Sequence, residues 1–117
     1  MIIAVVNLKG GVAKTTTAIA LATAIERQGH PVRVLDADPQ GSATLWADGA
    51  EDNGEPLPFE VQAANAGTIA RAAKRLGDDE WVVIDCPPSG KVADAAVMVC
   101  DFAVVPTTPS AIDLQQS

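Results

Sequence analysis

The chain has 117 residues, of which 48% are hydrophobic, and its 8 basic and 15 acidic side chains give a net charge of −7. This length and apolar content suit one globular domain with a modest core and exclude a disordered chain. The acidic balance argues against nucleic-acid binding through the overall field, and no signal-peptide pattern or apolar run of about 18 residues is visible. We therefore expect a cytoplasmic protein, in which Cys86 and Cys100 are reduced structural thiols.

Apolar runs alternate with helical patterns along the chain, which predicts a mostly parallel α/β sheet flanked by helices. The predicted strands are Ile2–Val6, Val32–Leu35, Phe59–Gln62, Trp81–Ile84 and Phe102–Val105. The predicted helices are Lys14–Gln28, one that begins near Ser42, Ala66–Leu76, Val92–Val99 and one that begins near Ser110. The first and fourth strands are nearly uninterrupted Val/Ile runs, as expected for central strands covered on both faces.

The loop between the first strand and the first helix has an unusual composition. Residues 9–16 read Lys-Gly-Gly-Val-Ala-Lys-Thr-Thr. Such a loop aims backbone N–H groups and the positive end of the helix dipole at one point, and glycines let the backbone approach phosphate oxygens. Lys14 would reach the β- and γ-phosphates of a nucleotide, Thr15 would hold Mg²⁺ and Thr16 would bind the α-phosphate.

This loop departs from the common P-loop pattern G-x-x-x-x-G-K-[ST] at two positions. Leu8 stands where that pattern has its first glycine, and Ala13 stands where it has the second. Ala13 would require a right-handed or extended backbone, because alanine at positive φ is costly. A plain Gly-Gly turn with solvated lysines is the alternative, and the strand and helix on either side favour the phosphate cradle.

Acidic residues follow the second strand, in the run Asp36-Ala37-Asp38-Pro39-Gln40-Gly41. The carboxyl ends of parallel strands gather at one edge of a sheet, where the phosphate loop also lies. At that edge Asp36 and Asp38 would help to coordinate a metal ion and to bind a water molecule. An aspartate-rich turn before a helix is the alternative interpretation of these two residues.

Two further segments predict an exposed loop and an amphipathic helix. Asp48–Pro58 is acidic and rich in turn residues, which predicts an exposed loop. The helix over Ala66–Leu76 is predicted to be amphipathic. Its expected apolar face consists of Ala66, Ile69, Ala70, Ala73 and Leu76, and its expected polar face of Arg71, Lys74 and Arg75.

The fourth strand ends in Asp85, within the run Trp81-Val82-Val83-Ile84-Asp85-Cys86-Pro87-Pro88. An apolar strand that ends in aspartate is the Walker B arrangement, in which the carboxylate holds Mg²⁺, commonly through water. A single strand-ending aspartate is a weak signal. Three such elements in the order phosphate loop, Asp36–Gly41 and Asp85 predict a site for ATP and Mg²⁺.

Taken together, these motifs resemble the ParA/Soj-type partition ATPases of the ParA/MinD group, whose phosphate loop is a deviant Walker A box. The matching segments are Lys9–Thr16, Asp36–Gly41, Ile84–Ser89 and the tail Val105–Leu114. The resemblance implies a P-loop NTPase-like α/β fold. Residues 1–117 would be the N-terminal portion of one P-loop ATPase domain, and later strands, the adenine-contacting segment and a DNA-binding surface would lie beyond Ser117.

The resemblance also implies roles for individual residues. Lys9 would reach phosphates bound by the other subunit of an ATP dimer, and Asp38 would position the attacking water. The implied catalytic residues are Lys9, Lys14 and Asp38. The implied nucleotide-binding residues are Lys9, Gly10, Gly11, Val12, Ala13, Lys14, Thr15 and Thr16, and the implied metal-binding residues are Thr15, Asp36 and Asp85.

The implied function is hydrolysis of Mg-ATP by a homodimer that forms on ATP and drives plasmid or chromosome partition. A ParB-like centromere-binding protein and nonspecific DNA would be its partners, in the cytoplasm or on the nucleoid, with no membrane. One alternative is another member of the same group, either MinD-like or cobyrinic acid a,c-diamide synthase-like. The run Asp38–Gly41 favours the ParA type over the synthase type. A non-catalytic fragment is the other alternative.

Overall fold

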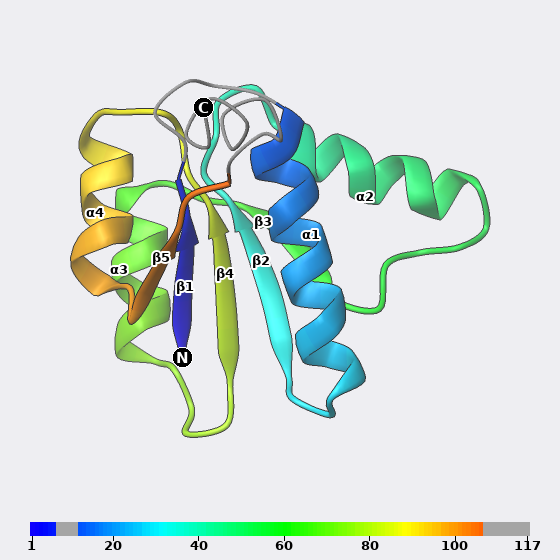
Figure 1. Cartoon of the computed structure of the whole chain (residues 1–117), viewed down its shortest axis with the longest axis horizontal. Helices are drawn as coiled ribbons and strands as arrows, with labels where there is room; N and C mark the ends of the chain where they lie inside the picture. Colours follow the sequence, from blue (N-terminus) through cyan, green and yellow to red (C-terminus); the bar gives the residue numbers. More distant parts are fainter. Residues whose placement is uncertain (7–11, 107–117) are drawn as a thin grey trace, which may run out of the picture.

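The computed structural model describes residues 1–6 and 12–106, in which strands and helices alternate along the chain (Figure 1). The elements are β1 (Ile2–Val5), α1 (Val12–Arg27), β2 (Val32–Asp36), α2 (Ser42–Asp52), β3 (Glu60–Ala63), α3 (Ala66–Lys74), β4 (Trp81–Asp85), α4 (Lys91–Val99) and β5 (Phe102–Val104). Within these described residues the strands form one 5-stranded sheet in the order β3-β2-β4-β1-β5, and every neighbouring pair is parallel. The predicted parallel α/β fold is thereby confirmed.

All the predicted strands are present, each with ends within one residue of the expected positions. The two Val/Ile-rich runs occupy interior positions of the sheet, β4 between β2 and β1 and β1 between β4 and β5. Every residue of β1 is buried, as are the last four residues of β4. Helices cover both faces of these strands, so both sets of alternating side chains are apolar.

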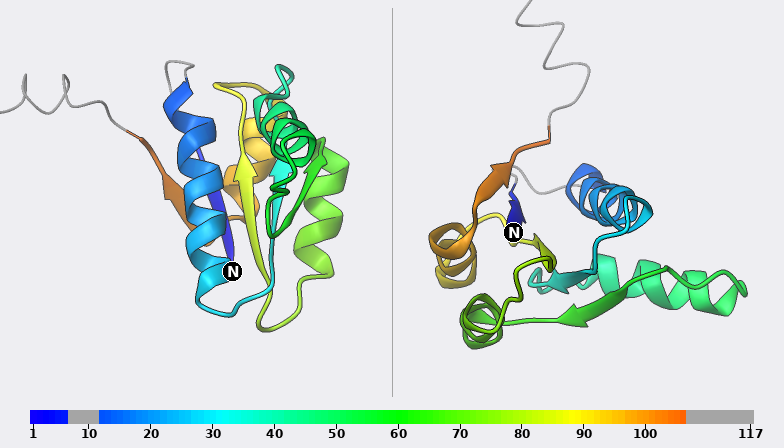
Figure 2. Two further views of the ribbon diagram at one scale, coloured as in Figure 1. Left: turned by 90° about the vertical axis from the view of Figure 1, so that its right-hand side faces the viewer. Right: turned by 90° about the horizontal axis from the view of Figure 1, so that it is seen from below.

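The helices form two layers with the sheet between them (Figure 2). On one face α1 and α2 pack on a core cluster of Ile3, Val5, Ala18, Ile19, Ala22, Ile25, Val34, Ala43 and Val83. On the other face α3 and α4 pack on Ile2, Ala4, Leu35, Ala37, Ile69, Ala72, Val82, Ile84, Cys86 and Ala96. Burial of each large aliphatic side chain contributes about 1.5–3 kcal/mol to folding.

Helix α2 is longer than the sequence pattern predicts. Asp48–Pro58 was expected to be a loop, but α2 continues to Asp52, so this prediction was wrong for the start of the segment. The chain leaves the helix at Asn53, whose N–H donates to the carbonyl group of Gly49, and the N–H of Gly54 donates to that of Glu51. A single interior glycine costs a helix only about 1 kcal/mol, which packing of its first turn can offset.

Helix α3 follows the predicted amphipathic pattern except at two alanines. Ile69 is buried, and Ala73 and Leu76 pack against the same core cluster, as expected, but Ala72 is buried and Ala70 is exposed. Alanines lie on all sides of this helix, so they do not define the edges of its packed face. Arg71, Lys74 and Arg75 are exposed as predicted, and Arg71 and Arg75 also line a cavity beside the sheet.

The helix predicted near Ser110 lies outside the described residues. Among the helices within residues 1–6 and 12–106, none has the length and apolar character needed to cross a membrane.

Candidate functional site

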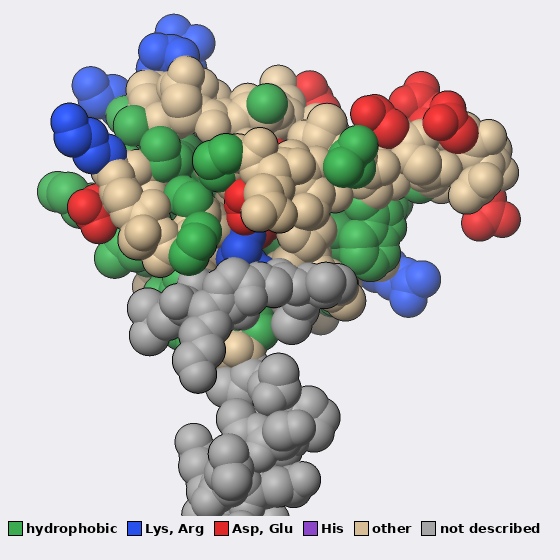
Figure 3. Space-filling view, turned by 90° about the horizontal axis from the view of Figure 1, so that it is seen from above, with side chains coloured by type: hydrophobic (Ala, Val, Ile, Leu, Met, Phe, Trp, Pro, Cys, Tyr) green, Lys and Arg blue, Asp and Glu red, His purple; other side chains and the backbone are tan. Residues whose placement is uncertain are grey.

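The carboxyl ends of β2 and β4 meet the first turn of α1 at one edge of the sheet. Asp36 and Asp85 are register partners at the ends of these two neighbouring strands. Helix α1 begins at Val12, so Lys14 and Thr15 lie in its first turn. Figure 3 looks down on this edge, and basic and acidic side chains meet near its middle. The structure therefore brings together the side chains that the sequence predicts to share a site.

Lys14 is buried between two carboxylates, with 1% of the residue exposed. Its Nζ donates to Asp38 Oδ2 at 2.8 Å and to Asp85 Oδ1 at 2.5 Å. Burial by itself would lower the pKa of Lys14, but the hydrogen bonds and charges of Asp38 and Asp85 outweigh it and raise the pKa. Lys14 is therefore a fully protonated cation at the centre of the site.

Asp85 is fully buried at the end of β4. Both of its oxygens are occupied, since Oδ1 accepts from Lys14 and Oδ2 accepts from the Thr15 hydroxyl at 2.9 Å. Burial raises the pKa of Asp85, and the hydrogen bonds and charge of Lys14 counter this only in part. Thr15 and Asp85, both predicted metal ligands, are thus in direct contact.

Asp36 has one occupied and one unoccupied oxygen. Its Oδ2 accepts from the Thr44 N–H at 2.9 Å and from the Thr44 hydroxyl at 2.6 Å. Asp36 thereby caps the N-terminus of α2 from the neighbouring strand, because Gly41 has no side chain to do so. Its Oδ1 is buried and has no hydrogen-bond partner among the described residues. A buried acceptor of this kind is the atom that an ion or a water would satisfy.

Asp38 stands at the more open side of the site, with 14% of its side chain exposed. Its Oδ1 accepts from the Gln40 N–H at 3.0 Å, which fixes the turn after β2. Burial alone would raise the pKa of Asp38, but the hydrogen bonds from Lys14 and the Gln40 N–H outweigh it and lower the pKa. Asp38 is therefore ionised at neutral pH.

A cavity of about 580 Å³ opens beside these carboxylates, beyond the ends of β2 and β3. Asp36 and Asp38 lie on its wall together with the turn Pro39–Gly41 and Thr44. Its volume lies within the usual range of small-molecule sites, about 300–1,000 Å³. The cavity leaves room for a ligand beside Asp36 and Asp38.

The residues present fit a magnesium ion that is shared with a phosphate ligand. In the part of the chain that the structure describes, no three His, Cys, Asp or Glu side chains form a complete metal cage. Mg²⁺ in nucleotide sites commonly takes only one or two carboxylates, and phosphates and waters complete its shell. The unpartnered Asp36 Oδ1, Asp85 and the Thr15 hydroxyl are oxygen donors of this type.

The remaining predicted residues divide into two groups. Lys9, Gly10 and Gly11 lie outside the described residues. Val12, Ala13 and Thr16 are part of α1, so the backbone of Ala13 is right-handed, as the sequence requires. The roles predicted for these residues remain predictions.

Sequence reasoning missed Thr44, which orients Asp36. The only signal for it was a threonine in the first turn of a helix that follows an aspartate-rich strand end. The cysteines take no part in the site, and both are free thiols. Burial raises the pKa of Cys86 to about 12, so this thiol stays protonated. The burial of Cys86 confirms the expectation of a structural thiol.

Comparison with known proteins finds similarity over almost the whole chain. Residues 3–116 match the family model CbiA, described as the CobQ/CobB/MinD/ParA nucleotide binding domain. The chain is 38% identical over 115 residues to the maintenance of carboxysome distribution protein A of Gloeobacter kilaueensis, a match that covers 97% of this chain and 51% of that protein. It is 30% identical over 117 residues to Protein ParA of Rhizobium radiobacter, covering 96% of this chain and 50% of that protein.

A third relative is the chromosome-partitioning ATPase Soj of Thermus thermophilus, 37% identical over 114 residues, covering 74% of this chain and 46% of that protein. The chain spans about half the length of these relatives. The fold is similar to that of cobyrinic acid a,c-diamide synthase from Mycobacterium smegmatis with bound ATP analog and magnesium. That match has a TM-score of 0.68 at 27% identity and covers 98% of this chain and 65% of that one.

Proposed function

Because the chain belongs to the CobQ/CobB/MinD/ParA family of nucleotide-binding domains, we propose that it binds Mg-ATP at the carboxyl edge of its sheet and hydrolyses it. The observation that carries this proposal is the position of Lys14. A buried lysine in the first turn of α1 is held by two carboxylates, Asp38 from the turn after β2 and Asp85 from the end of β4. The similar structure of the cobyrinic acid a,c-diamide synthase, solved with an ATP analog and magnesium, supports the same ligands here.

Nucleotide binding would exchange the partners of Lys14. Its ammonium group would turn from Asp38 and Asp85 to the β- and γ-phosphates, helped by the positive end of the α1 dipole. Thr15, Asp36 and Asp85 would hold Mg²⁺. When bound, Mg²⁺ would neutralise negative charge on the phosphate oxygens.

Asp38 would position the water that attacks the γ-phosphate. It is ionised, partly exposed and beside a cavity, so its carboxylate can accept a hydrogen bond from a water molecule once Lys14 has moved to the phosphates. The reaction is an in-line displacement, in which positioning and neutralisation of charge contribute most of the rate. The chain would supply both through Asp38 and Lys14.

We further propose that the whole protein acts as an ATP-dependent dimer that positions a cargo. The sequence similarity to ParA, to Soj and to a carboxysome distribution protein supports this class of function over the synthase. The cargo would be a plasmid, a chromosome or another large assembly. A ParB-like protein and nonspecific DNA would be its partners.

A Lys14→Ala variant tests the nucleotide site. The substitution removes the main cation for the phosphates, so we expect calorimetry to detect no Mg-ATP binding to it. Lys74→Ala, which removes an exposed lysine from α3, should bind as the parent does. Retained affinity in a folded Lys14→Ala protein would refute the site. If that variant does not fold, Lys14→Gln keeps a donor for Asp85, and unchanged Mg-ATP affinity in that variant would refute the site equally.

Lys9→Ala tests the dimer. The resemblance implies that this lysine would contact phosphates bound by the other subunit, so the variant should bind Mg-ATP but lose turnover that depends on association. The measurement is the phosphate release rate per subunit over a range of protein concentrations. A rate per subunit equal to that of the parent at every concentration would exclude a role for Lys9 in trans.

A further inference from the structure

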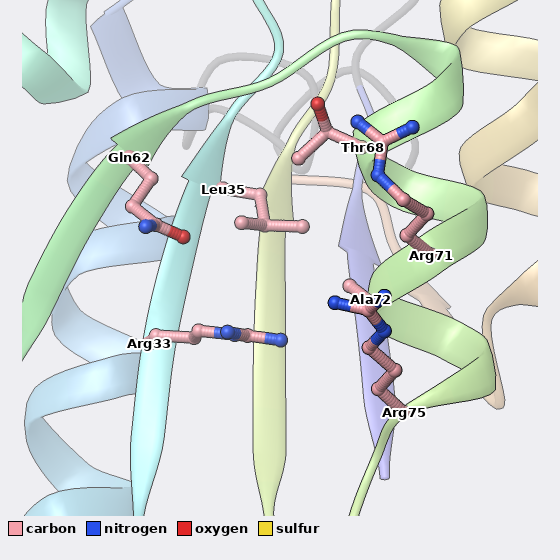
Figure 4. A pocket seen from close by; sticks show the side chains of 7 residues that line it. All are labelled: Arg33, Leu35, Gln62, Thr68, Arg71, Ala72 and Arg75. Atoms are coloured by element: carbon pink, nitrogen blue, oxygen red, sulfur yellow. The ribbon is translucent and has the colours of Figure 1, made fainter.

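A second and smaller cavity, of about 170 Å³, lies between β2, β3 and α3. Its polar walls are formed by Arg33 from β2, Gln62 from β3, and Thr68, Arg71 and Arg75 from or beside α3. Figure 4 shows Arg33 lying across the sheet toward α3. The cavity shares no lining residue with the larger one at the candidate nucleotide site. It is therefore a separate feature of the molecule.

The cavity also lies on a different face of the sheet. Arg33 and Leu35 alternate along β2 with Val34, which packs in the core cluster beneath α1. Alternate residues of a strand point to opposite faces, so Arg33 points to the face covered by α3. A ligand here would be separated from Lys14 by the thickness of the sheet.

The three arginines in this cavity, Arg33, Arg71 and Arg75, make no ion pair within residues 1–6 and 12–106. The Nε of Arg33 is buried and has no hydrogen-bond partner within that same part of the chain. A guanidinium group is always charged, and a buried N–H without an acceptor is unfavourable. The Nε–H of Arg33 is therefore a donor that an anion in the cavity would satisfy.

This concentration of positive charge is unusual in a chain with a net charge of −7. Figure 3 shows Lys and Arg side chains gathered on the side of α3, while acidic side chains gather over α2 on the other side. Glu60 is the acidic residue in register with Arg33 on β3. It shares the face of Arg33 but is exposed and makes no ion pair with it among the described residues.

We propose that this cavity binds a phosphate group, either inorganic phosphate or the phosphate of a small phosphomonoester. Arginine presents parallel N–H donors that match phosphate oxygens, and three such groups line this cavity together with the Gln62 amide. The Thr68 hydroxyl already donates to Asn65 Oδ1 at 3.1 Å, so the donors to the anion are the arginines and Gln62.

The volume of the cavity limits the size of the ligand that it can hold. Sites for molecules as large as a nucleotide commonly measure about 300–1,000 Å³, and this cavity is smaller, about 170 Å³. Liquid water occupies about 30 Å³ per molecule, so the volume holds one phosphate group and a few waters. The remainder of a phosphomonoester would extend through the open side of the cavity.

The test is a titration of the chain with inorganic phosphate, followed through the arginine side-chain Nε–Hε signals in nuclear magnetic resonance spectra. The signals of Arg33, Arg71 and Arg75 should shift and saturate. Arg27, at the end of α1 and outside the cavity, is the internal reference and should not shift. Sodium chloride at matched ionic strength should produce no saturable shift. A parallel titration with methyl phosphate distinguishes the free anion from a phosphomonoester.

Matched variants give the second part of the test. Arg75→Gln removes an exposed guanidinium group and should weaken phosphate binding about tenfold to a hundredfold. Glu60→Gln removes the neighbouring negative charge and should strengthen phosphate binding. Because no arginine is among the described residues of the nucleotide site, loss of nucleotide binding would not affect these signals.

Three outcomes would overturn the proposal. The first is the absence of a saturable shift at Arg33, Arg71 and Arg75 with either phosphate probe. The second is an equal shift at Arg27. The third is unchanged phosphate affinity in Arg75→Gln.

Discussion

Lys14 is held in the free protein by the same carboxylates that it would leave when a nucleotide binds. Its buried contacts with Asp38 and Asp85 satisfy three charged groups at once. Removal of Lys14 from Asp85 leaves a buried carboxylate that keeps only its hydrogen bond from Thr15. A cation that enters with the nucleotide would compensate for this loss, which physically couples phosphate and metal binding.

The meeting of Lys14, Thr15, Asp36 and Asp85 could be predicted because parallel strands end at one edge and a helix begins there. The partners of individual oxygens could not be predicted. Thr44 reaches Asp36 only because α2 starts at a particular angle after the Gly41 turn. That angle depends on packing against the sheet, which sequence periodicity does not report.

Asp38→Ala separates hydrolysis from binding. Mg-ATP affinity should stay within a few-fold of the parent, since Lys14 and the backbone of the loop hold the phosphates. Loss of a positioned acid–base group costs about 10²–10⁴-fold in rate. The measurement is phosphate release under saturating ATP, with Asp48→Ala on the exposed part of α2 as the control. Release at the parent rate from Asp38→Ala would assign the water to another residue.

At the scale of elements, the strands could be predicted closely, and the packed face of α3 could be predicted except at its alanines. Val/Ile runs bounded by turn residues define β1 and β4 almost without ambiguity. In helix α3 the alanines around Ile69 leave the edges of the packed face undefined. Arg71 and Arg75 lie on the predicted polar face, but the pattern does not show that Arg33 of β2 and Gln62 of β3 line a cavity together with them.

Two glycines of α2 should respond in opposite directions to substitution by alanine. Gly41, the N-cap, has φ of 65°, a left-handed conformation in which alanine costs about 1–2 kcal/mol. Gly49 lies inside the helix with no atom within 4 Å of an added Cβ, so alanine there should gain about 0.5–1 kcal/mol. Urea unfolding of both variants measures the difference. A stabilised Gly41→Ala protein would show that this turn is not strained.

At the scale of the molecule, apolar side chains are exposed at one edge. Met98 of α4 and Phe102 of β5 are 85% and 60% exposed, and β5 pairs only with β1 among the described strands. An open strand edge beside exposed apolar side chains is a common site of association. Leu45, which is 68% exposed on α2, lies away from this edge.

The 117-residue chain should therefore associate through the β5 edge without any nucleotide. Sedimentation velocity over a range of concentrations should show less association for Met98→Gln with Phe102→Thr than for the parent. Leu45→Gln is the control, because it also replaces an exposed apolar side chain by a polar one, and it should associate to the same extent as the parent. A parent chain that stays monomeric at high concentration, or an effect of Leu45→Gln alone, would contradict this surface assignment.

The ion pairs of Lys14 also determine how this lysine reacts with amine-modifying reagents. Amine-acylating reagents need an accessible and deprotonated amine, and Lys14 is neither, since it is 1% exposed and its neighbours raise its pKa. Lys74 and Lys91 are exposed and react directly with such reagents. We therefore expect Lys14 to be acylated slowly and only in molecules whose ion pairs have opened, so that its acylation rate reports that opening.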